Sequence, residues 1–273
     1  MGLYIVAGDP VTHSLSPVMH NAAFKALGMH NHRYGAARVT PHEAYVLIDA
    51  IRRGKVAGAN VTYPLKTVMH TLADKLTGRA QASGSVNTLW AEGRNIVGDS
   101  TDGEGCICAL REECMDVSQS SILLIGAGGA ARSIALSLFE HGARDVSILN
   151  RNEKKAAALC KSVGAYGHGP LRDLKRAIRE KDILINATTI GMKGHPRTLG
   201  VTEDDLDPSM LVMDIVYDPL ETPLLQAASA AGCRTIRGTK MLVWQGALSF
   251  ERWFGKKAPV NVMEDAILRT IGG

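Results

Sequence analysis

Lys66 and Asp102 have the side chains of a proton-transfer pair. A lysine amine can accept a hydroxyl proton or, as an ammonium, return it and stabilise the alkoxide, while a carboxylate orients both groups. A neighbouring carboxylate favours the charged lysine, whereas burial disfavours it. Each residue also has a structural interpretation: Lys66 as a surface lysine at a helix start, and Asp102 as the cap of the following helix. Their spacing alone leaves both interpretations open.

Other polar residues in the first part of the chain lie at predicted strand ends and loops, where functional side chains tend to gather. They are Ser14, Ser16, Asn60, Thr62, Ser85, Asn87, Thr88 and Thr101. Taken singly, the first two serines could cap a helix beginning at Pro17, and Asn60 and Thr62 could satisfy turn backbone. The set becomes informative only together with the rest of the chain.

A glycine-rich loop between a predicted strand and a predicted helix has the pattern of a dinucleotide-binding site. Residues 122–131 read ILLIGAGGAA. Gly126 permits a tight turn, Gly128 lets the backbone approach a pyrophosphate, and Ala131 lets the helix pack closely on the strand. Free N–H groups at the helix start would bind phosphate. The alternative is an ordinary loop rich in small residues. The predicted cofactor residues of this loop are Gly126, Ala127, Gly128, Gly129 and Ala130.

The end of the next predicted strand indicates which dinucleotide binds. An NAD site usually has an acidic residue about 20 residues further on, for the ribose 2′-hydroxyl, but this strand ends in Asn150-Arg151-Asn152. The Arg151 guanidinium suits a 2′-phosphate, with Lys154 or Lys155 assisting, which favours NADP. Glu153 competes with this interpretation, because it could reach a ribose hydroxyl. Arg151 could also be a solvated surface charge.

Read in order, the motifs of the chain resemble those of the shikimate/quinate dehydrogenase family. The matching segments are Ser14–Pro17 followed by His20-Asn21, Asn60–Lys66, Gly84–Thr88, Thr101–Gly103, the glycine loop, the Asn150-Arg151 strand end, Asn186–Met192, Asp214–Leu225, and Gly238 with Met241 and Gln245-Gly-Ala. They span nearly the whole chain. One departure is Ser100, where the family usually has asparagine. This departure leaves the fine substrate preference open, but not the reaction class.

The resemblance implies a reversible NADP-dependent reduction of 3-dehydroshikimate to shikimate, a step of chorismate and aromatic amino-acid biosynthesis. It implies that Lys66 and Asp102 are catalytic, with Lys66 either a general base or an electrostatic anchor. The residues implied to hold substrate, besides this pair, are Ser14, Ser16 and Tyr217 at the carboxylate and Asn60, Thr62, Asn87 and Gln245 at the ring hydroxyls. Those implied to line the nicotinamide site are Ala187, Thr188, Ile215, Gly238 and Met241.

Two alternatives remain beside this function. One is a quinate or quinate/shikimate dehydrogenase with relaxed substrate or NAD use, because quinate differs only by a saturated ring and one hydroxyl. The other is a non-catalytic NADP-binding sensor that keeps the fold. Such a sensor would be expected to lack Lys or Asp at the reacting positions, and both Lys66 and Asp102 are present.

The elements that must position these residues alternate between strands and helices, which predicts an α/β fold with largely parallel sheets. We expect an α/β substrate domain over residues 1–103, with a helix over Lys66–Leu76, and a doubly wound, Rossmann-type NADP-binding domain over residues 104–240. The resemblance implies that the terminal helices of residues 241–273 return to the substrate domain.

Composition bounds the remaining possibilities. The chain has 273 residues, 45% of them hydrophobic, and a formal net charge of +4 without a basic run, so a nucleic-acid-binding arm is not indicated. The mild basic excess suits small anionic ligands. Five scattered cysteines argue for a reducing compartment, and they match no zinc pattern. With no signal peptide and no long apolar run, we expect a cytoplasmic enzyme without a metal, a monomer or a homodimer.

Overall fold

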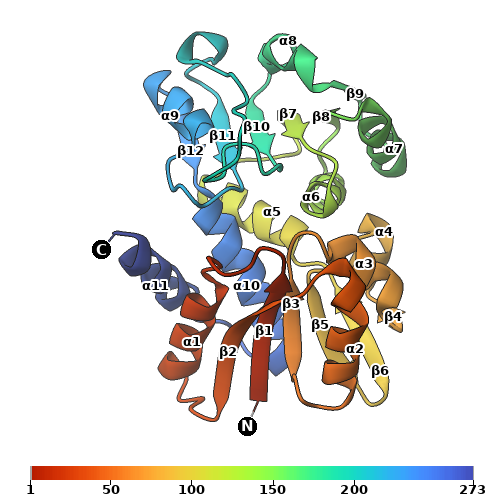
Figure 1. Cartoon of the computed structure of the whole chain (residues 1–273). Coiled ribbons are helices and arrows are strands. Elements are labelled where there is room, and N and C mark those ends of the chain that lie inside the picture. Colours follow the sequence, from red (N-terminus) through yellow and green to blue (C-terminus); the bar gives the residue numbers. More distant parts are fainter. Residues whose placement is uncertain (1, 273) are drawn as a thin grey trace. The chain divides into compact units, whose positions relative to one another are not determined.

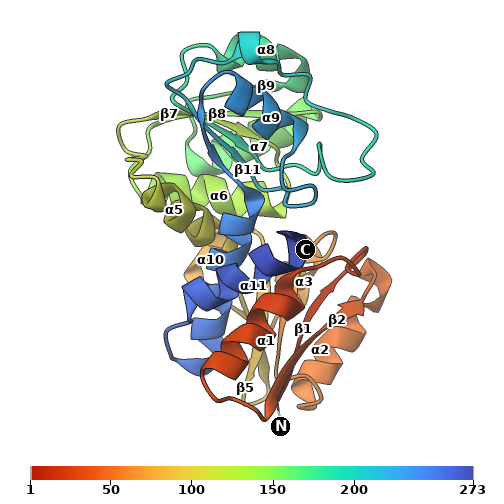
Figure 2. The same ribbon diagram turned by 90° about the vertical axis from the view of Figure 1, so that its left-hand side faces the viewer.

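The computed structural model describes residues 2–272 and divides the chain into two compact units (Figure 1). Unit 1 comprises Met1–Gly105 and Val243–Gly273, and unit 2 comprises Cys106–Leu242. Two helices, α5 (Asp102–Glu112) and α10 (Gly238–Phe254), each have residues in both units. The predicted α/β class is confirmed. The terminal segment returns to unit 1, where α11 (Val260–Gly272) packs against α1 (Ser16–Ala26), as Figure 2 shows.

Unit 1 contains a six-stranded sheet with the order β2-β1-β3-β5-β6-β4. Its strands are β1 (Gly2–Gly8), β2 (His32–Arg38), β3 (Gly58–Val61), β4 (Lys75–Leu76), β5 (Thr88–Glu92) and β6 (Asn95–Asp99). The sheet is mixed rather than largely parallel, because β5 runs antiparallel to both β3 and β6. Glu92 pairs with Asn95, so β5 and β6 form a tight hairpin, and Gly93 has the positive φ of +63° that such turns favour.

The alternation of side chains along β1 separates two cores in unit 1. Ile5 and Ala7 face the helices α2 (Ala44–Arg52) and α3 (Lys66–Leu72), where they join an aliphatic cluster. Tyr4 points to the opposite face, where its ring lies 4.8 Å from that of Trp253 on α10 and 5.9 Å from that of Phe24 on α1. The sheet is therefore buried on both faces, and α10 is held by aromatic packing.

The helix expected over Lys66–Leu76 ends earlier, at Leu72. Ala73 is extended, and Lys75–Leu76 pair with Val97 and Gly98 as the edge strand β4. Asp74 supports this break, because its carboxylate accepts a hydrogen bond from Ile96 N at 2.7 Å. A short helix, α4 (Gly78–Ser83), follows. Tertiary pairing with β6 thus overrides the local helical pattern.

Unit 2 contains a six-stranded parallel sheet with the order β12-β11-β10-β7-β8-β9. Its strands are β7 (Ser121–Ile125), β8 (Asp145–Asn150), β9 (Gly167–Pro170), β10 (Ile183–Asn186), β11 (Leu211–Asp214) and β12 (Arg234–Ile236), and its other helices are α6 (Gly129–Glu140), α7 (Glu153–Val163), α8 (Leu174–Ile178) and α9 (Pro223–Ala230). The chain leaves β7 toward β8 in one direction and later returns to add β10 on its other side, so the strand order reverses at β7. Ligands of open α/β sheets bind at the carboxyl ends of strands at this point.

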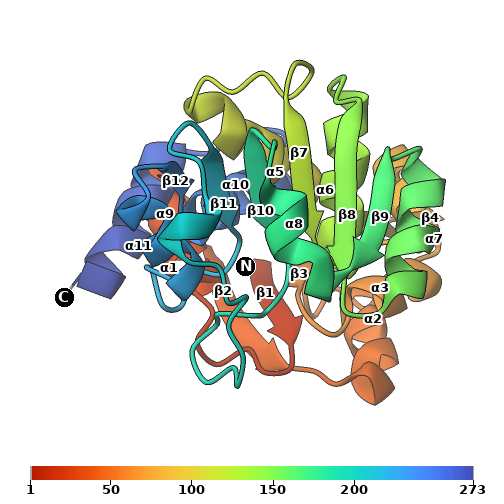
Figure 3. The ribbon, with the colours of Figure 1, turned by 90° about the horizontal axis from the view of Figure 1, so that it is seen from above.

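Helices cover both faces of this sheet, as the view from above shows (Figure 3). Leu123 and Ile125 of β7 pack in one cluster with Leu174 of α8 and Leu224 of α9. The Rossmann-type architecture that the sequence predicted is confirmed. The sequence did not predict β9, whose residues Gly-His-Gly-Pro lack a strand-like apolar pattern and depend on pairing with β8.

Candidate active site

Lys66 and Asp102 lie in direct contact in unit 1. Lys66 is the first residue of α3 and Asp102 the first residue of α5. The Lys66 Nζ lies 2.6 Å from the Asp102 Oδ2, and the two side chains are 18% and 4% exposed. The carboxylate also benefits from the partial positive charge at the start of α5. The structure thus joins the two residues into a pair that is largely shielded from solvent.

Asn87 fixes the other oxygen of the carboxylate. Its Nδ2 donates to Asp102 Oδ1 and to Thr101 Oγ1, each at 2.9 Å, and lies 3.2 Å from Gln245 Oε1. Its Oδ1 accepts from Thr101 N at 2.8 Å. Asn87 is buried, with 1% of its surface exposed. Two residues predicted to contact substrate, Asn87 and Gln245, are therefore gathered beside the Lys66–Asp102 pair.

Asn60 lies deeper in the same polar network. Its Nδ2 donates to Ser249 Oγ at 2.8 Å and to Asn87 O at 3.1 Å, and its Oδ1 accepts from the Tyr34 hydroxyl at 2.7 Å. Burial raises the pKa of Tyr34 well above its ordinary value, opposed in part by a hydrogen bond with Ser16, so the phenol stays a donor. The role of Asn60 toward substrate remains a prediction, but its amide already organises the site.

The serines and the threonine predicted to hold substrate lie near the carboxyl ends of β1 and β3. The backbone N–H of Ser16 lies 3.3 Å from Ser14 Oγ, and Ser16 is buried while Ser14 and Thr62 are half-buried. Thr62 directly follows β3 and packs over Gly8, where an added Cβ would come within 2.8 Å of Tyr63 O. The ends of β1 and β3 therefore meet at Gly8 and Thr62, and the two serines follow β1 near the start of α1.

The glycine loop of unit 2 has two glycines that are required for different reasons. Gly126 has a φ of +120°, and an added Cβ would lie 2.9 Å from Ala187 O and 3.1 Å from Thr188 Cγ2. Gly128, at the start of α6, has an extended conformation, and an added Cβ there would have no described atom within 4 Å. Protein packing requires the first glycine but not the second. The space above Gly128 and the N–H groups of α6 fit a dinucleotide pyrophosphate.

The segment expected to select the dinucleotide connects β8 to α7. Asn150 Nδ2 donates to Asn152 O at 2.9 Å, and Asn152 caps α7 by accepting from Lys155 N at 3.3 Å. Arg151 and Lys154 are exposed on this fixed turn. Their guanidinium and ammonium groups are therefore available to an anionic ligand near the end of β8.

Three of the predicted nicotinamide residues, Ala187, Thr188 and Ile215, follow the carboxyl ends of β10 and β11, and the other two, Gly238 and Met241, are on α10. Asn186 Nδ2 donates to Asp214 Oδ1 at 2.9 Å, and Thr222 Oγ1 donates to Asp214 Oδ2 at 2.7 Å. Burial raises the pKa of Asp214 to about 6, although the hydrogen bonds to it act in the opposite direction. Ala187 directly follows Asn186 in the sequence, and Ile215 directly follows Asp214. A Cβ added at Gly238 would collide with the carbonyl oxygens of Ile215 and Val216, so these segments approach closely.

The remaining predicted residues fall into different units. Met241 is buried in unit 2, Tyr217 is half-buried in the loop of unit 2 after β11, and Gln245 is in unit 1 on α10.

Within residues 2–272, no group of three or more His, Cys, Asp or Glu side chains is arranged to hold a metal ion. In the same range, no helix is both long and apolar enough to cross a membrane.

Comparison with known proteins matches nearly the whole chain. Three family models align in order: the shikimate dehydrogenase substrate binding domain over residues 6–89, shikimate/quinate 5-dehydrogenase over 109–214, and the shikimate 5′-dehydrogenase C-terminal domain over 238–268. The shikimate dehydrogenase (NADP(+)) of Methanosarcina barkeri is 42% identical, with 97% of each chain covered. The chain belongs to the shikimate dehydrogenase family.

Solved structures of this family are similar in fold as well. The shikimate 5-dehydrogenase of Thermus thermophilus, in complex with NADP(H) and shikimate, is 33% identical, has a TM-score of 0.88, and covers 98% of this chain and 99% of its own. The quinate dehydrogenase of Corynebacterium glutamicum, in complex with NAD, is 28% identical, has a TM-score of 0.86, and covers 98% and 99%.

The residues that sequence analysis missed are those that organise the site from outside the motifs. Tyr34, Ser249 and Arg252 lie outside the segments that carry the resemblance. Ser249 and Arg252 each make hydrogen bonds to the strand and turn segments around Asp99 and Thr101. Their spacing from Gln245 along α10, four and seven residues, was the signal that could have placed them on one helix face.

Proposed function

We propose that the chain catalyses the reversible NADP-dependent reduction of 3-dehydroshikimate to shikimate. Membership of the family and the names of its relatives support this activity. The observation that carries the proposal is the contact of 2.6 Å between Lys66 Nζ and Asp102 Oδ2. A non-catalytic sensor would have no need of a lysine and a carboxylate held together in a shielded site, so this contact favours an enzyme.

Lys66 and Asp102 handle the proton of the reaction. In shikimate oxidation the pair accepts the proton of the 3-hydroxyl. In the reverse direction the Lys66 ammonium stabilises the developing alkoxide and delivers the proton. Asn87 holds Asp102 Oδ1, so that Asp102 Oδ2 stays directed at the lysine. NADP, when bound, exchanges the hydride.

Unit 1 is proposed as the substrate domain and unit 2 as the NADP domain. Ser14 and Ser16 would donate to the substrate carboxylate, while the amides of Asn87 and Gln245 would contact ring hydroxyls. In unit 2, Gly126–Ala130 would hold the pyrophosphate and Arg151 the 2′-phosphate. The chain's free cysteines fit a reducing compartment, so we place the enzyme in the cytoplasm, as a monomer or a homodimer.

The activity is tested by initial rates of NADP reduction with shikimate. Lys66→Ala should lower kcat by about 10²–10⁴, the range typical for loss of a general acid or base, with little change in substrate binding. Lys55→Ala is the matched control, because Lys55 is an exposed lysine of the same unit. A Lys66→Ala enzyme that keeps the turnover of the control would show that the mechanism is wrong.

Quinate oxidation is the second candidate function. It is favoured by the similarity to the quinate dehydrogenase of C. glutamicum. Ser100, which stands where the family usually has asparagine, leaves the choice between the two substrates open. Rates with shikimate and quinate, each with NADP and NAD, separate the two candidates. We expect the highest kcat/KM with shikimate and NADP. A higher value with quinate would reassign the substrate.

A further inference from the structure

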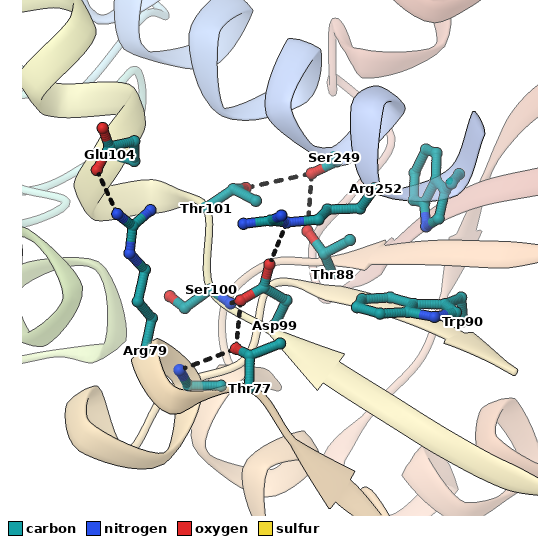
Figure 4. Close-up of polar contacts among 12 residues, drawn as sticks. Thr77, Arg79, Thr88, Trp90, Asp99, Ser100, Thr101, Glu104, Ser249 and Arg252 are labelled. Atoms are coloured by element: carbon teal, nitrogen blue, oxygen red, sulfur yellow. Dashed lines mark hydrogen bonds and ion pairs between the residues drawn. The ribbon is translucent and has the colours of Figure 1, made fainter. Parts of the chain in front are cut away.

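One face of α10 contacts the turn that carries Asp102. Gln245, Ser249 and Arg252 are spaced four and then three residues apart, so they lie on the same side of the helix. Ser249 Oγ lies 3.2 Å from Thr101 Oγ1 and 2.7 Å from Thr88 Oγ1. Figure 4 shows these contacts beside the contact of Arg252 with Asp99. All of these contacts lie within unit 1.

Asp99 is the last residue of β6, and its carboxylate is buried with 1% of the side chain exposed. Oδ2 accepts from Arg252 Nε at 2.8 Å, and Oδ1 accepts from Ser100 N at 2.8 Å and from the Thr77 hydroxyl (Figure 4). The backbone oxygen of Asp99 accepts from Asn87 N at 3.0 Å. Among these donors Arg252 supplies the positive charge that compensates the buried carboxylate.

The contacts of Asp99 continue directly to the reacting pair. Only Ser100 and Thr101 separate Asp99 from Asp102. Thr101 Oγ1 donates to Gln245 O at 2.9 Å, and the side chain of Asn87 joins Thr101 to Asp102. A displacement of Asp99 would therefore move Asp102 against Lys66, and a displacement of Arg252 would move the helix face that carries Gln245.

We infer that Asp99 and Arg252 form a positioning pair for the proposed reaction. The pair fixes the end of β6 to α10, so that Asp102 and Gln245 are held at one place. The inference rests on the proposed function, and neither residue is a catalytic residue, because each acts through Asp102, Asn87 or Gln245. Arg252 is 48% exposed at its side chain, so it can be replaced without leaving a large internal void.

If Asp99 and Arg252 contributed only to stability, the rates and melting temperatures of the variants would follow a different pattern. Removal of Arg252 alone leaves a buried carboxylate without its cation, which destabilises a folded protein. If stability were all that the pair provides, activity would follow the melting temperature in every variant. The combination Asp99→Asn with Arg252→Gln removes both charges, so it separates the loss of stability from the loss of position.

The experiment compares Arg252→Gln, Arg252→Lys and the double variant Asp99→Asn/Arg252→Gln with the control Arg53→Gln, which removes an exposed arginine paired with Asp49. Melting temperatures are measured beside kcat and KM for shikimate and NADP. We expect Arg252→Gln to lower kcat at least about tenfold, because small misplacements of catalytic groups cost up to about a hundredfold. The KM for NADP should stay within about twofold, since the cofactor loop is in unit 2.

The double variant should recover most of the melting temperature but not the kcat, and Arg252→Lys should recover part of the kcat. The profile of kcat against pH should shift in Arg252→Gln and stay unchanged in Arg53→Gln. A folded Arg252→Gln enzyme with the kcat of the control would overturn the positioning pair, as would rates that follow melting temperature throughout. If Arg252→Gln does not fold, the double and lysine variants decide by the same criteria. A wild-type chain that is inactive with shikimate would instead contradict the proposed function, and with it this inference.

Discussion

The candidate sites of the two units are built in different ways. In unit 1 the candidate functional groups are side chains, and Lys66 and Asn87 each donate a hydrogen bond to the carboxylate of Asp102. In unit 2 the proposed pyrophosphate site consists of backbone groups, and an added Cβ at Gly128 would meet no described atom within 4 Å. One site is organised by contacts between distant segments, and the other by the local conformation of a few consecutive residues.

This difference follows from what each site is proposed to do. Proton transfer needs groups held in one geometry, since the barrier depends on their orientation. A pyrophosphate needs donors and space, which a helix N-terminus with glycines provides. Substitutions should therefore affect turnover in unit 1 and cofactor binding in unit 2.

The largest effect is expected at Asp102. In Asp102→Asn the amide has a single oxygen. If that oxygen accepts from Asn87, an NH₂ group faces Lys66; if it faces Lys66, it is neutral and the hydrogen bond from Asn87 is lost. The loss of the carboxylate should lower kcat by about 10²–10⁴ with little change in the KM for NADP. The measurement is steady-state kinetics with shikimate, with Asp204→Asn, an exposed aspartate, as the control. Unchanged turnover would contradict the proposed difference between the units, because the proton-transfer step would then not depend on Asp102 of unit 1.

Substitution of Arg151 should change the KM for NADP rather than kcat, the opposite of what is expected at Asp102. Replacing Arg151 with Ala would remove the proposed charge-assisted bond to the 2′-phosphate, so the KM for NADP should rise by about 10- to 100-fold while that for NAD hardly changes. The exposed Arg176 of unit 2 provides the control variant Arg176→Ala. An equal rise for both dinucleotides would remove the argument that Arg151 selects NADP.

The same contrast explains what sequence analysis could and could not predict. The glycine loop between β7 and α6 was predicted because its conformation depends on residues that are adjacent in the chain. The approach of Ser249 to Thr101 and of Arg252 to Asp99 joins residues 148 and 153 positions apart. No local pattern marks such contacts, since they exist only after α10 has packed on the sheet of unit 1.

The end of one helix and the existence of β9 were not predicted from the sequence, for a related reason. The helix pattern after Lys66 continues through Leu76 in the sequence, but β6 offers backbone partners to Lys75 and Leu76. In the same way β9 becomes a strand only beside β8. The strands of unit 2 that contain a continuous apolar run, such as residues 122–125 of β7 and 183–185 of β10, were predicted well, because burial on both faces leaves such a run.

A pair of glycine substitutions sharpens the comparison inside unit 2. Gly126→Ala should destabilise the fold by about 1–3 kcal/mol, because its φ is positive and the new Cβ would press on Ala187. Gly128→Ala should leave the free energy of unfolding nearly unchanged but weaken NADP binding roughly tenfold, because the Cβ occupies ligand space. Urea denaturation and titration with NADPH, followed by its fluorescence, measure the two effects. If Gly128→Ala destabilised the protein as much as Gly126→Ala, the packing of the protein itself, and not a ligand, would require glycine at position 128.

The effect expected at the buried carboxyl of Asp214 is on stability alone, as a dependence on pH. Its pKa in the folded protein is about 6, above the ordinary value of 3.8, because the carboxyl is buried. Between these two values the folded chain keeps a proton that the unfolded chain has released, so this group's contribution to stability falls as pH rises from about 4 to about 6. The slope is at most about 1.4 kcal/mol per pH unit. Asp214→Asn cannot titrate, so the difference in unfolding free energy between wild type and variant should fall across this window and be constant above it. Parallel curves from urea denaturation would show that Asp214 is ionised throughout, and that its bonds to Asn186 and Thr222 outweigh its burial.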